Sequence, residues 1–134
     1  MERNLNILRW SLFAGAVYFM GIAFAHMFGL KVPFLFVYFN VPSYAYQDRI
    51  ISFLAFGWSV YLFTAFIDPV KNSGLVKAIL FSGTGTIIGL SAINILTDFG
   101  KLSKDIDVSI FWIETIALSV YVIWLFVFYY RSRK

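Results

Sequence analysis

Two ionisable side chains stand inside long apolar runs and are the first candidates for chemistry. His26 and Glu114 are each surrounded by mostly apolar residues. An ionised carboxylate inside a membrane-spanning helix costs about 2.5–3.5 kcal/mol on insertion scales, so such a residue needs a partner or a function. We expect both side chains at a similar depth near one end of the fold, where they could share a proton or form a salt bridge.

Further polar side chains are expected at the same end. Together they predict either an outward-facing ligand or proton-coupling pocket, with His26 and Glu114 at its floor and two tyrosines at its lid, or a structural network that fixes helix register. The sequence favours the structural network, and the pocket remains as the alternative. The other candidate residues are Asn94, Asp98, Arg49, Asp48, Tyr44 and Tyr46.

Metal, cofactor and thiol chemistry have little support in the sequence. The chain has one histidine, without the HxxE or HxxH spacing of a metal motif, and it has no cysteine. No nucleophile, oxyanion arrangement or cofactor fingerprint can be recognised, so no catalytic residue, metal or cofactor is predicted. The sequence therefore favours a non-enzymatic protein, and an enzyme acting on a lipid or quinone headgroup has the least support.

Four long apolar runs must position these residues. A helix of about 20 mostly apolar residues crosses a hydrocarbon core, and continuous runs lack the alternation of a barrel strand. With 60% hydrophobic and 13% charged residues, a soluble chain of this size would have apolar surface that it could not bury, so the composition argues against a soluble fold. The sequence predicts an all-α integral membrane protein, a four-transmembrane-helix bundle in one domain over residues 1–134. The predicted helices are residues 8–30, 50–67, 75–97 and 108–130.

Basic residues are distributed unequally between the two ends of this bundle. Seven precede the first run, accompany the second connection or follow the last run, and four accompany the other two connections. The positive-inside rule then places the N- and C-termini in the cytoplasm, which predicts a multi-pass protein of the cytoplasmic (inner) membrane. Arg3, Arg9 and the small residues Ala23 and Ala25 resemble a secretory signal. We nevertheless expect the first run to be a retained helix.

The connection between the first two runs is unusually aromatic. Six phenylalanines and tyrosines lie between Lys31 and Arg49, and Pro33 and Pro42 interrupt helical continuity there. Such rings are typical of the membrane interface. We expect an interfacial loop that anchors the protein, and the alternative is a lid over a ligand site.

The third run carries the clearest predicted packing face. Small residues recur on one face of this helix, and Gly85 and Gly89 form a GxxxG pattern, which lets another helix approach closely. We expect packing within the chain, against Gly21 and Ala25 of the first helix, and the alternative is a second protein. The predicted face consists of Ala78, Ser82, Gly85, Gly89 and Ala92.

Two functions follow as expectations. The first is a non-enzymatic accessory or interaction subunit that packs through small-residue and aromatic helix faces. The alternative is a small dimeric transporter or ligand-binding bundle that uses Glu114 and His26. The expected partners are the lipid bilayer and other membrane-protein subunits or a second copy, and no nucleic acid is expected, because the basic residues fit a membrane topology.

Overall fold

Four long helices make up almost the whole fold in the computed structural model, which describes residues 2–133. Each helix is long and apolar enough to cross a membrane, and no strand occurs among the described residues. The prediction of an all-helical chain with four such helices is therefore confirmed. The elements are α1 (Glu2–Phe28), α2 (Ala45–Ile67), α3 (Ser73–Leu96), the short 3-10 helix η1 (Phe99–Lys101) and α4 (Val108–Arg131).

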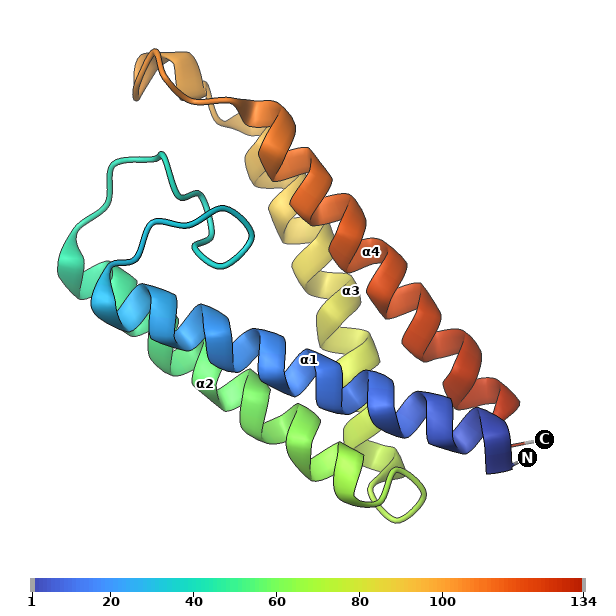
Figure 1. Ribbon diagram of the computed structural model, residues 1–134. Coiled ribbons are helices and arrows are strands. Elements are labelled where there is room, and N and C mark those ends of the chain that lie inside the picture. Colours follow the sequence, from blue (N-terminus) through green and yellow to red (C-terminus); the bar gives the residue numbers. More distant parts are fainter. Residues whose placement is uncertain (1, 134) are drawn as a thin grey trace.

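The helices form two pairs that converge at one end and diverge at the other (Figure 1). The α1–α2 pair crosses the α3–α4 pair, and α1 also packs on α4 and α2 on α3. Both termini and the α2–α3 connection lie where the pairs converge, and we call this the termini end. At the opposite, loop end, the α1–α2 loop (residues 29–44) lies between the pairs. The loop therefore fills space that helix packing leaves open.

A stripe of small residues on α2 brings α1 and α2 together. Ser52, Ala55 and Ser59 are buried at steps of three and four residues, which places them on one helix face. The Ser59 hydroxyl donates to the carbonyl oxygen of Ala16 on α1 at 2.7 Å. Small side chains permit this approach, and the interhelical hydrogen bond fixes its register.

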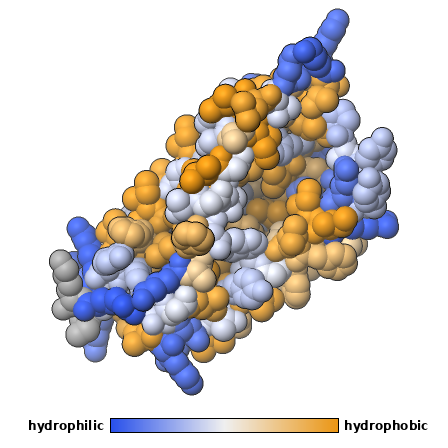
Figure 2. Space-filling view, turned by 180° about the vertical axis from the view of Figure 1, so that it is seen from behind, coloured by the Kyte–Doolittle hydropathy of each residue, from blue (hydrophilic) through white to orange (hydrophobic). Residues whose placement is uncertain are grey.

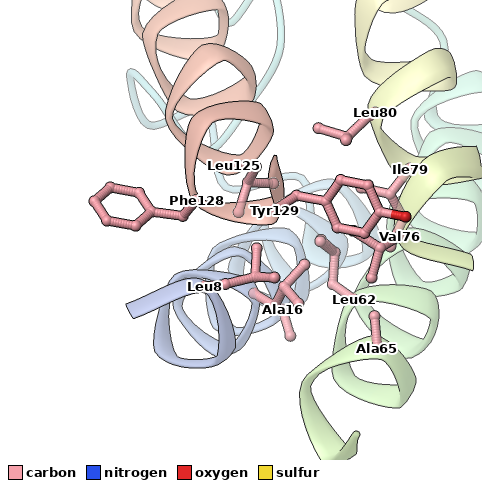
Figure 3. Packing of buried hydrophobic residues seen from close by; sticks show 11 residues of the cluster. Leu8, Ala16, Leu62, Ala65, Val76, Ile79, Leu80, Leu125, Phe128 and Tyr129 are labelled. Carbon is pink, nitrogen blue, oxygen red and sulfur yellow. The ribbon is translucent and has the colours of Figure 1, made fainter. Parts of the chain in front are cut away.

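The hydrophobic core lies at the termini end, where all four helices meet (Figure 3). Leucine side chains of α1, α2 and α4 pack there with aliphatic side chains of α3. Dispersion contacts in such a core hold the pairs together at this end. The core consists of Leu8, Leu12, Ala16, Leu62, Ala65, Val76, Ile79, Leu80, Leu125, Phe128 and Tyr129.

The predicted small face of α3 is uncovered in the chain. A Cβ atom built at Gly85 or Gly89 meets nothing within 4 Å. Gly83 instead faces α4, where an added Cβ would lie 2.9 Å from Cγ2 of Val122. The expectation that this face packs within the chain is wrong, because α3 turns Gly83 toward its neighbour and leaves the GxxxG face outside. Ala78 and Ser82 are exposed as well, and Ala92 is half-buried.

The predicted partners of that face on α1 have other contacts. An added Cβ at Gly21 would lie 3.3 Å from Leu35 of the α1–α2 loop. Ala25 is buried, and its carbonyl oxygen accepts from the N–H group of Leu30 at 2.8 Å. These two residues thus support the loop and the end of α1, not a contact with α3.

On the face shown in Figure 2, hydrophobic and pale residues lie between hydrophilic residues at the two ends, and large apolar side chains are exposed on all four long helices. Large side chains such as Phe81 and Leu96 are 84% and 82% exposed. A water-soluble domain rarely exposes continuous apolar surface of this kind.

Candidate functional site

Hydrogen bonds attach the α1–α2 loop to all four helices. Four of these bonds, one to a side chain of each helix, hold the loop between the pairs, so the loop does not float at the surface. The bonds are Phe34 N–H to Glu114 Oε1 of α4 (2.9 Å), Val37 N–H to His26 Nε2 of α1 (3.1 Å), Tyr38 hydroxyl to Asn94 Oδ1 of α3 (3.0 Å) and Ser43 hydroxyl to Asp48 Oδ2 of α2 (3.0 Å).

Two loop residues adopt a backbone conformation that L-amino acids seldom take. Phe34 and Tyr38 have φ angles of 66° and 55°. Left-handed non-glycine residues cost of order 1–3 kcal/mol and persist only where surrounding contacts fix them. Both residues bond to a helix, and the Phe34 carbonyl also accepts from the Tyr18 hydroxyl of α1. The contacts with the helices offset the backbone strain of the loop.

His26 is a buried support for the loop. The residue is 1% exposed and its ring stacks on Phe36, with ring centroids 3.9 Å apart. Because Nε2 accepts from Val37, the ring is neutral and carries its proton on Nδ1. Nδ1 lies 3.9 Å from Oδ1 of Asp48, and neither of these atoms has a hydrogen-bond partner.

Glu114 and His26 do not form the pair that the sequence suggested. Glu114 binds the Phe34 N–H group, and the acidic group within 4.0 Å of His26 is Asp48. Both side chains do lie at the loop end, but they do not bind each other. Each one accepts a hydrogen bond from a different backbone N–H group of the loop. The expectation of a shared proton between Glu114 and His26 is therefore wrong.

Asn94 joins α3, α4 and the loop. It is 6% exposed, accepts from Tyr38 and donates from Nδ2 to the Thr115 hydroxyl oxygen of α4 at 3.1 Å. Burial raises the pKa of Tyr38 to about 12, and the Glu114 carboxylate adds to this rise. Tyr38 is therefore a neutral donor over the whole physiological pH range.

A cavity of about 430 Å³ lies between α1, α3, α4 and the loop. Its size is that of a small-molecule pocket. The wall is mostly apolar and aromatic, and Glu114 is its only ionisable carboxyl group among the described residues. The lining residues are Ala14, Gly15, Tyr18, Phe19, Ile22, Phe34, Val37, Tyr38, Thr86, Leu90, Phe111, Glu114, Thr115, Ala117, Leu118 and Tyr121.

Of the eight candidate residues, only Glu114 lines this cavity, so the predicted place of His26 at the pocket floor is wrong. His26, Asp48 and Asn94 are buried and bonded to the loop, and the other four are exposed. Tyr44 and Tyr46 are 68% and 61% exposed and stack on each other, with ring centroids 5.8 Å apart. Asp98 forms an exposed ion pair with Lys101 at 3.0 Å, and Arg49 is exposed. The prediction that Tyr44 and Tyr46 form a lid is therefore wrong. The loop residues that line the cavity are Phe34, Val37 and Tyr38.

Sequence reasoning missed several residues of the site. Tyr18, Thr115 and Tyr121 line the cavity, and each is a hydroxyl within an apolar run, which is a signal the sequence contains. The positive φ angles that place Phe34 and Tyr38 leave no such signal, because both residue types normally avoid that conformation.

The fold and the site define a bundle of four long apolar helices with a ligand-sized cavity that its own loop lines on one side. No protein family, curated protein or solved structure matches this chain. Among residues 2–133, no three His, Cys, Asp or Glu side chains gather where they could hold a metal ion.

Proposed function

We propose that this chain is an integral protein of the cytoplasmic membrane that binds a membrane-soluble small molecule in the cavity between α1, α3 and α4. Membrane insertion is supported by four helices of spanning length, each with large apolar side chains exposed. The excess of basic residues at the termini end supports a cytoplasmic location for both termini.

The cavity itself carries the proposal of binding. It has a volume of about 430 Å³, its wall is mostly apolar, and a few polar groups converge on it, as in most small-molecule sites. The loop, bonded to every helix, keeps the helix pairs apart at this end. Four helices are few for a transport pathway, so transport by this site requires a dimer.

Binding can be tested with a neutral, compact probe, 1-adamantanol. We expect it to bind the protein in nanodiscs above the level of empty nanodiscs, measured by equilibrium dialysis. Ala117→Trp should reduce this binding at least about tenfold, because the indole occupies the cavity that Ala117 lines.

The matched control for this experiment is Val120→Trp. Val120 also lies on α4, is 60% exposed and does not line the cavity. Equal binding by the wild type and Ala117→Trp, or no specific binding by either, contradicts the proposal.

A second candidate function, an accessory subunit of a larger membrane complex, is favoured by the uncovered small face of α3. Nothing within 4 Å covers a Cβ atom at Gly85 or Gly89, so another helix has room to approach there. Gly85→Leu or Gly89→Leu should then release a co-purifying partner and leave the chain inserted, as read by pull-down and mass spectrometry. Thr84→Leu, on an exposed position away from this face, is the control. A partner that stays bound to both leucine variants contradicts this candidate.

A further inference from the structure

The hydroxyl groups that line the cavity all donate hydrogen bonds to acceptors within the chain. Each one has an acceptor on the chain, so none is free to donate to a ligand. Their acceptors are the carbonyl oxygens of Phe34 (for Tyr18), Ser82 (for Thr86), Phe111 (for Thr115) and Ser11 (for Tyr121), and Oδ1 of Asn94 (for Tyr38). Apart from the carboxyl group of Glu114, the side chains of the cavity therefore offer a ligand only acceptor atoms.

Glu114 has a hydrogen bond but no cationic partner. Oε1 accepts from the Phe34 N–H group at 2.9 Å, and no Lys, Arg or His nitrogen among the described residues lies within 4.0 Å of the carboxylate. No basic side chain lines the described cavity either. A carboxylate in this apolar surrounding gains most from a positively charged group placed beside it.

Aromatic rings surround the same space. Phe34 and Tyr38 of the loop, Phe111 of α4, and Tyr18 and Phe19 of α1 all line the cavity. The negative faces of such rings attract a cation, most strongly where water is excluded.

We propose that the cavity selects lipophilic ammonium compounds, with the cationic head beside Glu114 among the aromatic rings and the apolar body against α1, α3 and α4. This inference rests on the proposed function, since it names the ligand class for the same cavity. Anionic ligands, and neutral ligands that can only accept hydrogen bonds, find no donor side chain there. They would leave Glu114 unpaired, which makes their binding weaker.

Probes of one shape and opposite charge test this selection. We expect 1-adamantanamine, which is an ammonium ion at neutral pH, to bind at least about tenfold more tightly than 1-adamantanecarboxylate, with 1-adamantanol between them. Binding is measured by equilibrium dialysis against protein in nanodiscs of neutral lipid, with empty nanodiscs subtracted.

Glu114→Gln should abolish the preference for the ammonium probe, and it keeps an oxygen that can accept from Phe34, so the loop stays docked. Asp98→Asn is the charge control, because it removes an exposed carboxylate at the same end without touching the cavity. It should leave the preference unchanged.

The outcomes separate this inference from the proposed function. Binding of 1-adamantanol without a preference for the amine overturns the ammonium selection and leaves the ligand cavity in place. An unchanged preference in Glu114→Gln, or an equal loss in Asp98→Asn, also overturns the role of Glu114. Failure of every probe to bind counts against the proposed function itself.

Discussion

Gly15→Ala is expected to lower the free energy of unfolding by about 1–3 kcal/mol, the usual cost of forcing a methyl group into a packed contact. A Cβ atom at Gly15 of α1 would overlap Oη of Tyr121 and lie 2.9 Å from its Cζ. The phenol of α4 cannot move freely, because its hydroxyl donates to the Ser11 carbonyl oxygen at 3.0 Å. Either this bond breaks or α1 moves away from α4. Unfolding by SDS titration in mixed micelles, followed by tryptophan fluorescence, measures the change.

Gly57→Ala provides the matched control for this substitution. Nothing lies within 4 Å of a Cβ atom at Gly57 in α2, so alanine there should leave stability unchanged or raise it by up to about 1 kcal/mol. In a Tyr121→Phe background the cost of Gly15→Ala should fall, because the overlapping oxygen is gone. A Gly15→Ala variant as stable as Gly57→Ala would show that α1 and α4 do not meet as described.

The helices could be predicted from the sequence, but their contacts could not. Apolar runs of spanning length identify a helix whatever its neighbours are, because the solvent alone dictates the pattern. Which small residues meet a partner depends on how each helix is rotated about its axis. The sequence favoured Gly85 and Gly89, whereas Gly83 faces α4 and the Ser52–Ser59 stripe of α2 faces α1. Small residues occur on more than one face, so spacing by itself did not select the right one.

The sequence predicted where the candidate polar residues lie, but it did not predict their hydrogen-bond partners. His26, Asp48, Asn94 and Glu114 do lie together at the loop end, away from the apolar core. The first three are buried and Glu114 is half-buried. Their partners are amides and hydroxyls of the loop, and a path of the backbone through positive φ angles cannot be read from residue types. The pairing of Glu114 with His26 failed for this reason.

His26→Ala is expected to release the α1–α2 loop and to lower the free energy of unfolding by about 2–4 kcal/mol. The variant removes the ring that stacks on Phe36 and the acceptor of the Val37 N–H group. The left-handed conformations at Phe34 and Tyr38 then lose part of the support that offsets their strain. Amide hydrogen exchange over residues 32–41, followed by mass spectrometry, should become at least about tenfold faster.

Two further variants separate the stacking from the hydrogen bond. His26→Phe keeps an aromatic ring against Phe36 but has no acceptor, so the Val37 amide should exchange faster with a smaller loss of stability. Tyr46→Ala, at an exposed position of α2, should change neither quantity. Wild-type exchange at Val37 in His26→Ala would contradict the docking of the loop.

Release of the loop should also weaken ligand binding in the cavity, although His26 does not line it. Phe34, Val37 and Tyr38 form the cavity wall on the loop side, and Val37 is bonded to His26 through its backbone. His26→Ala should therefore weaken the binding of 1-adamantanol, while Tyr46→Ala leaves it unchanged. Loss of loop protection with unaltered probe binding would show that the ligand space depends on the helices alone. Joint loss would show that the loop, held by a side-chain acceptor on each helix, builds the site.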